Sequence, residues 1–361
     1  MKRLAIICMH PVQYYAPLFQ LMAQNHIIKV FYHSKAIGVR YDRDFQLAVE
    51  WDLPLLDDYE HEFSQHLKSI LAFRPSAVLI YGWASLSHLS LLIYFKRRLP
   101  VFFRGDSTLL DPKPKLTTML RSCWLKYIYK KVDFAFYVGR QNKAYFQQFG
   151  LKDRQLIYLP HAVDNARFAV DQSTAASNIR AGLGIKASEI LILFTGKFSR
   201  KKGPHLLLNA FIDLNKPNTH LLFVGKGVLE QVLKDVANDV VNGKNIHFLP
   251  FSNQRQMPAI YQSCDLFCLP SIGPGETWGL AINEAMAAGK AVLASDCAGA
   301  AHDLIDETNG AVFETGNISD LTNKLHVLTN DMSILKFMGK QSSRKIQAFN
   351  FQQQINAIYG A

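Results

Sequence analysis

The chain has 361 residues, a net charge of +11, and 49% apolar against 19% charged residues. That length exceeds one ordinary hydrophobic core and predicts two domains, and that composition is ordinary for a globular protein. No apolar run reaches the roughly 18 residues that a transmembrane helix needs, so we expect no helix to cross a bilayer.

The first residues combine positive charge with a short apolar stretch. Basic residues precede Leu4–Met9, but His10 and Pro11 then stand where a signal peptide would have its small-residue cleavage site. A first buried β-strand explains the stretch better, so the expected location is the cytoplasm. The five cysteines are scattered and odd in number. We interpret the one close pair, Cys264 and Cys268, as small buried hydrophobes rather than a metal or redox site.

Short apolar runs alternate with longer helical stretches along the chain. The runs are rich in β-branched and aromatic residues and lack strict alternation, which is typical of parallel strands that helices bury on both faces. They are Leu4–Met9, Ile28–His33, Ala77–Tyr81, Val101–Arg104 and Phe134–Val138, then Leu191–Thr195, Leu221–Val224, Ile246–Leu249, Leu266–Leu269 and Ala291–Ala294. Two such series predict an α/β protein with two doubly wound, Rossmann-like sheets, whose ligands bind at the carboxyl ends of the strands.

Polar, small and turn-prone residues collect near Asn165–Ser188, where we place the break between the two domains. The expected domains are residues 1–165 and residues 166–345, followed by a last segment, 346–361. Two sheets that face one another would place the site in the cleft between them.

Positive charge concentrates in the first half, where residues 1–165 hold 22 Lys and Arg against 13 Asp and Glu. A basic half indicates an anionic partner, which is a phosphate-bearing acceptor, an acidic membrane surface or a nucleic acid. Residues 115–132 mix helically spaced aromatics with cations. That mixture fits a helix lying on an acidic leaflet, and the commoner alternative is a domain helix with a solvated basic face.

The most informative stretch runs from Leu269 to Gly289. A strand ends, a Gly/Pro loop follows, and a helix begins near Leu280. The free N–H groups and positive dipole end of that helix suit a phosphate. Glu276 lies in the loop and Glu284 about a turn inside the helix, so both carboxylates can face one ligand and hold the hydroxyls of a sugar or ribose.

This stretch, together with Gly289–Asp296 and Asn309-Gly310, resembles the E-x7-E signature of glycosyltransferase family 4. The resemblance implies the GT-B fold, in which two Rossmann-like doubly wound domains face a central cleft. It implies an N-terminal acceptor domain, a C-terminal nucleotide-sugar domain, and a last helix that crosses back to the first domain. Glu276 would then contact the donor sugar and Glu284 the nucleotide ribose. The diphosphate would meet the backbone amides of Gly279, Leu280 and Ala281.

A second stretch, Gly196–Gly203, places four cations just after a predicted strand. A leaving nucleoside diphosphate needs positive charge, and without a metal ion Lys or Arg must supply it. Lys202 matches a lysine of the family pattern, whereas Lys197 stands where arginine is usual. We expect Gly196, Lys197 and Arg200 to bind the donor and Lys202 to stabilise the leaving group. The alternative is a solvated charged turn, which the pair of glutamates disfavours.

In the first half, His10 and Gln13 follow the first predicted strand, where donor or acceptor groups would pass. Arg104 ends another predicted strand and Asp106 follows it, at the place where many relatives carry a His-Asp pair, so the family histidine is missing. Asp106 is expected to orient an acceptor hydroxyl or take its proton, and Arg104 to pair with a phosphate. The segment Tyr81-Gly82-Trp83 either lines an acceptor groove or packs in the core.

The resemblance implies transfer with retention at the anomeric carbon, and together with these features it predicts a retaining, metal-independent glycosyltransferase. It would move a sugar from a nucleotide-sugar, a UDP-sugar in preference to a GDP-sugar, to a hydroxyl of a glycan or glycolipid in cell-surface polysaccharide or lipopolysaccharide synthesis. No cofactor and no nucleic acid are expected, and the protein is expected to be peripheral on the inner face of the membrane. The alternatives are a GT-B epimerase or phosphorylase and a basic nucleic-acid-binding protein. A nicotinamide dehydrogenase is disfavoured because no G-x-G-x-x-G follows the first strand. The turn Pro160–Asp164 resembles the family's interdomain turn, and we interpret it as structural, with His161 reaching toward the site.

Overall fold

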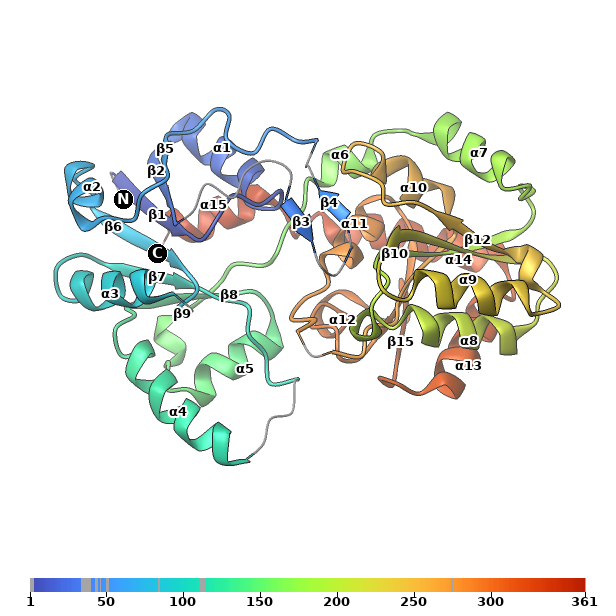
Figure 1. Ribbon diagram of the computed structural model, residues 1–361. Coiled ribbons are helices and arrows are strands. Elements are labelled where there is room, and N and C mark those ends of the chain that lie inside the picture. The colour runs from blue at the N-terminus through green and yellow to red at the C-terminus, as the bar shows by residue number, and fades with distance from the viewer. Residues whose placement is uncertain are drawn as a thin grey trace. The chain divides into compact units, whose positions relative to one another are not determined.

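The computed structural model describes residues 3–33, 40–42, 45, 47–49, 52–83, 85–110, 115–273 and 275–360. The chain divides into two compact units (Figure 1). The first unit comprises Met1–Gly38, Leu53–Ala162 and Asn350–Ala361, and the second comprises Val39–Asp52 and Val163–Phe349. These limits differ by a few residues from the borders expected at 165 and 345. The larger difference is the segment 39–52, which the sequence placed in the first domain and which here counts with the second unit.

The first unit is built on one seven-stranded sheet with the order β5-β2-β1-β6-β7-β8-β9. All its neighbouring strands are parallel, and Leu4 of β1, for example, pairs with Ile28 of β2 and Ala77 of β6. The strands are β1 (Arg3–Cys8), β2 (Ile27–Tyr32), β5 (His61–Glu62), β6 (Ala77–Tyr81), β7 (Val101–Arg104), β8 (Phe134–Tyr137) and β9 (Leu156–Tyr158). The helices are α1 (Ala16–Asn25), α2 (Leu67–Ala72), α3 (Leu86–Phe95), α4 (Lys115–Tyr129), α5 (Arg140–Gln148) and α15 (Phe351–Tyr359).

The second unit repeats this plan with a six-stranded parallel sheet in the order β12-β11-β10-β13-β14-β15. Its strands are β10 (Ile190–Lys197), β11 (Thr219–Lys226), β12 (Ile246–Leu249), β13 (Leu266–Leu269), β14 (Ala291–Ser295) and β15 (Gly310–Phe313). Its helices are α6 (Asn165–Ala169), α7 (Ser173–Gly182), α8 (Pro204–Leu214), α9 (Glu230–Asn238), α10 (Met257–Ser263), α11 (Leu280–Ala287), α12 (Ala301–Leu304), α13 (Ile318–Leu328) and α14 (Met332–Ile346). A short antiparallel hairpin, β3 (Arg40–Asp42) with β4 (Leu47–Val49), belongs to the same unit.

All ten strands expected from the sequence form, so the prediction of two Rossmann-like doubly wound domains is confirmed. The arrangement of the domains around a cleft stays a prediction. The polar stretch in which the domain break was placed contains α6 and α7, and α7 packs against α10 and buries Ala176. Tertiary packing has therefore overridden a composition that favours a loop.

The strand order fixes where ligands can bind. In each sheet the order reverses between two neighbouring strands, which are β1 and β6 in the first unit and β10 and β13 in the second. The helices that follow such strands leave on opposite faces of the sheet, so a crevice forms at the carboxyl ends. Gly225 adds a local constraint in the second unit. Its φ is +147°, and a Cβ there would lie 1.9 Å from the carbonyl oxygen of Gly196, its partner in the ladder. The ends of β10 and β11 can therefore approach only with glycine at this position.

Apolar side chains cover the faces of both sheets. The first unit has two clusters of buried residues, one that includes Phe103 and Phe146 and one that includes Phe19 and Phe136. In the second unit, Phe194, Phe211 and Phe223 belong to one large cluster. Within the described part of the chain, no helix is both long and apolar enough to cross a membrane.

Candidate functional site

An ion pair joins the two strands at the reversal of the second sheet. Lys202 lies in a short 3-10 turn (Arg200–Lys202) that follows β10, and Glu276 lies in the loop that follows β13. The Lys202 Nζ donates to Glu276 Oε2 at 2.5 Å, and the Ser271 hydroxyl donates to the same oxygen at 2.7 Å. The Glu276 side chain is only 10% exposed, so water screens this pair weakly. The structure thus brings together two residues that the sequence singled out separately.

The helix α11 begins directly after this loop. Gly279 is its N-cap residue, with a φ of +96°, and a Cβ there would lie 2.8 Å from the Leu269 side chain. Glycine permits both the left-handed backbone and the close approach. The first helical residues are Leu280 and Ala281, as expected. Their amides lie at the positive end of the helix, where an anion is favoured.

Glu284 lies one turn further along α11 and is buried. Its Oε2 accepts a hydrogen bond of 2.7 Å from the hydroxyl of Tyr261, which in turn lies 3.1 Å from Thr195 Oγ1. A buried carboxylate needs such partners, because the loss of hydration would otherwise be costly. Tyr261 comes from α10 and Thr195 from β10, so this chain of hydrogen bonds joins three elements when α11, which carries Glu284, is included. The sequence indicated Glu284 but gave no signal for Tyr261.

Lys197, expected to bind the donor, has a carboxylate partner in this structure. Its Nζ lies 3.1 and 2.9 Å from the two carboxylate oxygens of Asp42 and 5.0 Å from the centre of the Phe45 ring. The Phe45 ring also contacts the ring of Phe251, at 5.1 Å between centroids. Asp42 and Phe45 belong to the β3–β4 hairpin segment, which sequence reasoning did not connect with this unit. Arg200 is exposed at the start of the neighbouring turn.

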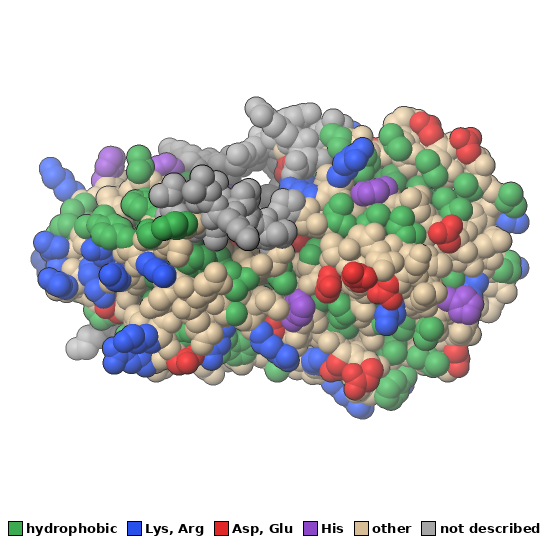
Figure 2. All heavy atoms as spheres, turned by 90° about the horizontal axis from the view of Figure 1, so that it is seen from below, with side chains coloured by type: hydrophobic (Ala, Val, Ile, Leu, Met, Phe, Trp, Pro, Cys, Tyr) green, Lys and Arg blue, Asp and Glu red, His purple; other side chains and the backbone are tan. Residues whose placement is uncertain are grey.

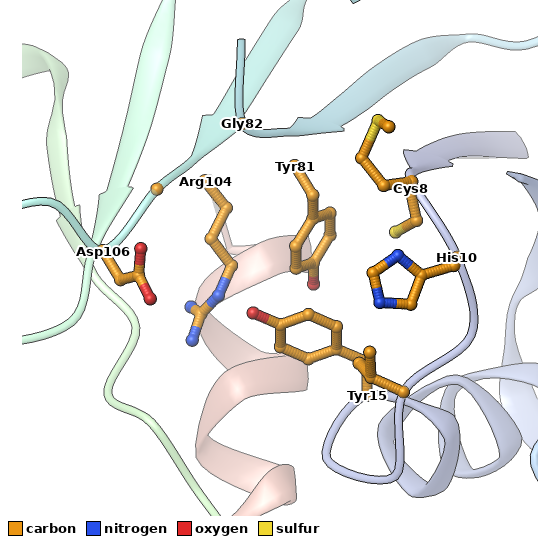
Figure 3. Close-up of a pocket in the computed structure, with 10 residues that line it drawn as sticks. Cys8, His10, Tyr15, Tyr81, Gly82, Arg104 and Asp106 are labelled. Carbon is orange, nitrogen blue, oxygen red and sulfur yellow. The ribbon is translucent and has the colours of Figure 1, made fainter. Parts of the chain in front are cut away.

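A cavity of about 200 Å³ lies in the first unit, at the carboxyl ends of β1, β6 and β7 (Figure 3). The residues that line it are Cys8, Met9, His10, Val12, Tyr15, Tyr81, Gly82, Arg104, Gly105 and Asp106. His10, Arg104 and Asp106, predicted from separate parts of the sequence, are therefore brought to one pocket. Gln13 is not among the lining residues. The segment Tyr81-Gly82-Trp83 was expected either to line an acceptor groove or to pack in the core. Tyr81 and Gly82 line the pocket, whereas Trp83 packs against the core.

Arg104 is the buried cation of this pocket. It is 3% exposed, and its guanidinium donates to the Leu159 carbonyl at 2.9 Å and to His161 Nδ1 at 3.3 Å. Burial, and then the charge of Arg104, hold the pKa of His161 well below its ordinary value. His161 is therefore neutral, accepts from Arg104 through Nδ1, and carries its proton on Nε2. That nitrogen lies 4.0 Å from the half-exposed carboxylate of Asp106. His161, interpreted from the sequence as part of a structural turn, thus accepts a hydrogen bond from one charged residue of the pocket, Arg104, and lies near a second, Asp106.

Two tyrosines complete the pocket. The rings of Tyr15 and Tyr81 lie 4.8 Å apart, and Arg104 forms a hydrogen bond with the Tyr15 hydroxyl. Burial raises the pKa of Tyr15 to about 12, although Arg104 opposes the shift, and burial also raises the pKa of Tyr81. Both hydroxyls are therefore protonated at neutral pH. The sequence reading did not single out Tyr15, which is the N-cap residue of α1.

The cysteines have the role expected of them. Cys264 and Cys268 are buried, and burial raises the pKa of the Cys264 thiol to about 12. The Cys264 thiol donates to the carbonyl of Tyr261. Both residues act as small packing groups. Among the residues that the structure describes, no cluster of three or more His, Cys, Asp or Glu is arranged to hold a metal ion.

The second unit is similar to a family of known proteins. Residues 176–345 match the model of the family described as Glycosyl transferases group 1. An uncharacterized glycosyltransferase of Methanocaldococcus jannaschii is 31% identical over 134 residues, which are 37% of this chain and 34% of that protein. The GDP-mannose-dependent alpha-(1-6)-phosphatidylinositol monomannoside mannosyltransferase of Mycolicibacterium smegmatis is 27% identical over 60% of this chain and 58% of its own length. The matches thus span about a third to three fifths of these two relatives.

Solved structures are similar over the whole chain. The Anabaena protein HepE, in complex with UDP and glucose, has a TM-score of 0.75 at 16% identity, covering 100% of this chain and 99% of that one. Sucrose-phosphate synthase from Thermosynechococcus elongatus has a TM-score of 0.74 at 18% identity, covering 100% and 98%. This likeness confirms the GT-B fold class. Together with the family match it confirms the resemblance to GT-B glycosyltransferases, whereas membership of family 4 and the role of the two glutamates stay predictions.

Proposed function

We propose that this protein is a retaining glycosyltransferase of family 4 that takes its sugar from a nucleotide-sugar without a metal ion. The observation that carries the proposal is the Lys202–Glu276 pair at the carboxyl edge of the second sheet, beside the start of α11 and the buried Glu284. The family match over residues 176–345 supports it, because this region contains all of these residues.

Each group has a task in the proposed reaction. Glu284 holds the ribose, Glu276 accepts hydrogen bonds from the donor sugar, and the first amides of α11 meet the diphosphate. Lys202, with Arg200 nearby, stabilises the negative charge that grows on the leaving diphosphate. The acceptor attacks from the face that the diphosphate leaves, so the anomeric configuration is kept. The protein contributes positioning and charge rather than a covalent nucleophile.

The donor is proposed to be a UDP-sugar in preference to a GDP-sugar. The similar Anabaena structure contains UDP and glucose, whereas the mycobacterial relative is named for GDP-mannose, so the base must be measured. The acceptor is proposed to be a hydroxyl of a glycan or glycolipid in cell-surface polysaccharide or lipopolysaccharide synthesis. His10 and Asp106 line the pocket of the first unit, where that hydroxyl would be oriented.

Calorimetric titration with UDP, GDP and ADP in the presence of EDTA tests the donor site. We expect one nucleotide to bind the wild type, and Glu284→Ala to lose about tenfold to hundredfold in affinity, since a hydrogen bond to a charged group is worth about 1.5–3 kcal/mol. Glu307→Ala, an exposed glutamate of the same unit, is the matched control and should bind like the wild type. No binding by any nucleotide, or equal binding by Glu284→Ala, would contradict the assignment.

We further propose that the first unit docks on the anionic inner face of the cell membrane through α4. The helix exposes Trp124 and Tyr127, whose rings stack at 5.9 Å, and Lys131 lies over the Tyr127 ring. Lys and Arg side chains are numerous over the first unit, on the left of the face in Figure 2. Exposed aromatics beside cations suit a lipid interface. Liposome flotation should recover the protein with anionic vesicles and not with neutral ones, and equal recovery from both would refute this docking.

A further inference from the structure

The pocket of the first unit contains groups that the transfer of a sugar to a neutral hydroxyl does not need. Orientation of such a hydroxyl requires an acceptor of hydrogen bonds, and Asp106 supplies one. The same pocket contains the buried guanidinium of Arg104 and the hydroxyls of Tyr15 and Tyr81. These three groups are hydrogen-bond donors, so they call for an acceptor on the ligand.

Arg104 is the first of these donors. It is 3% exposed, and it donates to the Leu159 carbonyl and to His161, both of which are neutral. A buried positive charge held by neutral partners is expensive unless a counter-charge accompanies it. The planar guanidinium has five N–H donors and matches the oxygens of a phosphate or carboxylate better than those of a neutral sugar.

Tyr81 is the second donor, and it carries the strongest evidence. Its side chain is 9% exposed, and its hydroxyl is buried with no hydrogen-bond partner among the described residues. A buried hydroxyl without a partner is destabilising unless a ligand satisfies it. Because burial raises the pKa of Tyr81, this hydroxyl keeps its proton and can donate.

The three donors converge. Figure 3 shows the Tyr15 hydroxyl pointing toward the guanidinium of Arg104, with Tyr81 beside them and Asp106 on the other side of Arg104. The Arg104 guanidinium carbon lies 6.0 Å from the centre of the Tyr81 ring, which is itself 4.8 Å from that of Tyr15. The ten-residue helix α1 begins right after Tyr15, so its positive end adds to the attraction for an anion.

We propose that this pocket binds an oxyanion, a phosphate or a carboxylate, carried by the acceptor itself, through Arg104, Tyr15 and Tyr81. Asp106 then takes a hydroxyl of the same molecule, because its negative charge repels the oxyanion and favours a donor. The acceptor is thus an acidic sugar or polyol. This inference rests on the proposed function, in that it takes the occupant of the pocket to be the acceptor of the transfer.

Binding of simple acidic sugars tests the inference on the full chain. The probes are glucuronic acid for a carboxylate, glucose 6-phosphate for a phosphate, and glucose as the neutral reference, each titrated by ligand-observed NMR. We expect at least one acidic sugar to bind about tenfold more tightly than glucose, which corresponds to about 1.4 kcal/mol. The acidic sugar that binds identifies the chemistry of the oxyanion.

The variant Tyr81→Phe locates the binding. It removes a hydroxyl without a partner among the described residues, so the fold should keep its Tm, while affinity for the acidic sugar should fall about tenfold. Tyr359→Phe is the matched control, since its hydroxyl is also buried without a partner in the described structure but lies on α15, outside the pocket. It should bind like the wild type.

Three results would overturn the proposal: glucose binding as tightly as both acidic sugars, binding of neither acidic sugar, or Tyr81→Phe binding like the wild type. None of these depends on the nucleotide titration, which reports on Glu284 in the other unit. If acidic sugars bind and no nucleotide binds, the proposed glycosyltransferase function is refuted and the proposed oxyanion pocket is retained. If a nucleotide binds and no acidic sugar does, the protein remains a proposed glycosyltransferase, and its acceptor is neutral.

Discussion

The hydroxyl of Tyr261 connects two polar side chains in the interior of the second unit, and its removal should lower stability by a predictable amount. Tyr261 is fully buried, donates to Glu284 Oε2 at 2.7 Å and lies 3.1 Å from Thr195 Oγ1. Tyr261→Phe keeps the ring but deprives a buried carboxylate of a charge-assisted hydrogen bond, at a cost of about 1.5–3 kcal/mol. For a unit of this size, that cost corresponds to a fall in Tm of roughly 3–12 °C.

Differential scanning calorimetry at neutral pH measures this difference. Tyr359→Phe is again the matched control, because it removes a buried tyrosine hydroxyl that has no partner among the described residues. Its Tm should equal or slightly exceed that of the wild type. A Tyr261→Phe transition within about 1 °C of the wild type would lie below the range that the hydrogen-bond energy predicts and would refute the reasoning. It would mean that water or rearrangement replaces the lost bond.

Three further predictions test other parts of the structure. Gly225→Ala should destabilise the second unit strongly, since its Cβ would lie 1.9 Å from a backbone oxygen. Gly182→Ala, at the end of α7, has open space around its Cβ and should raise Tm. Denaturant melts in which both variants change stability by the same amount would contradict this. Burial lowers the pKa of His247 to about 4, so as the pH falls the unfolded chain takes up a proton before the folded chain does, and the free energy of unfolding should decrease from about pH 6.5 to pH 4. In denaturant melts across this range, His247→Gln should make the stability depend less steeply on pH. An unchanged dependence would contradict the prediction. Asp42→Asn should remove one carboxylate partner of Lys197 and tighten nucleoside diphosphate binding by up to about fivefold, as judged for a partly exposed pair. Weaker binding in a titration would show that the Asp42 charge assists the donor instead.

Much of the fold was predictable because buried parallel strands have an unmistakable pattern. Apolar runs such as Leu266–Leu269 and Ala291–Ala294 lie between helical stretches and form strands at nearly the expected limits. The shortest strands of the seven-stranded sheet, β5 and β9, are two and three residues long, which is too few positions for a period of hydrophobic residues to show. Helix α7 was missed because Ser, Thr, Ala and Asn in succession favour a loop, and only packing against α10 reverses that preference.

The candidate site was predictable for residues that directly follow neighbouring parallel strands, because such residues lie close together at the same end of the sheet. Lys202 and Glu276 follow strands that are neighbours in a Rossmann-like order, so their meeting follows from topology. The contact of Lys197 with Asp42 joins residues 155 positions apart through a hairpin that is not part of either main sheet. No local pattern marks such a pairing. The same holds for His161, whose contact with Arg104 spans 57 positions and depends on how β7 and the segment after β9 lie together.

The central claim is that Lys202 stabilises the charge of the leaving diphosphate and that Glu276 accepts hydrogen bonds from the donor sugar. The most direct test is calorimetric titration, with EDTA present, of UDP-glucose against UDP and of GDP-mannose against GDP, in the wild type and in Glu276→Gln. We predict that Glu276→Gln binds the diphosphate at least as tightly as the wild type, because Lys202 loses its carboxylate partner, and binds the nucleotide-sugar about tenfold more weakly. Equal losses for diphosphate and nucleotide-sugar, or no loss for either, would contradict this division of tasks and with it the proposed donor site.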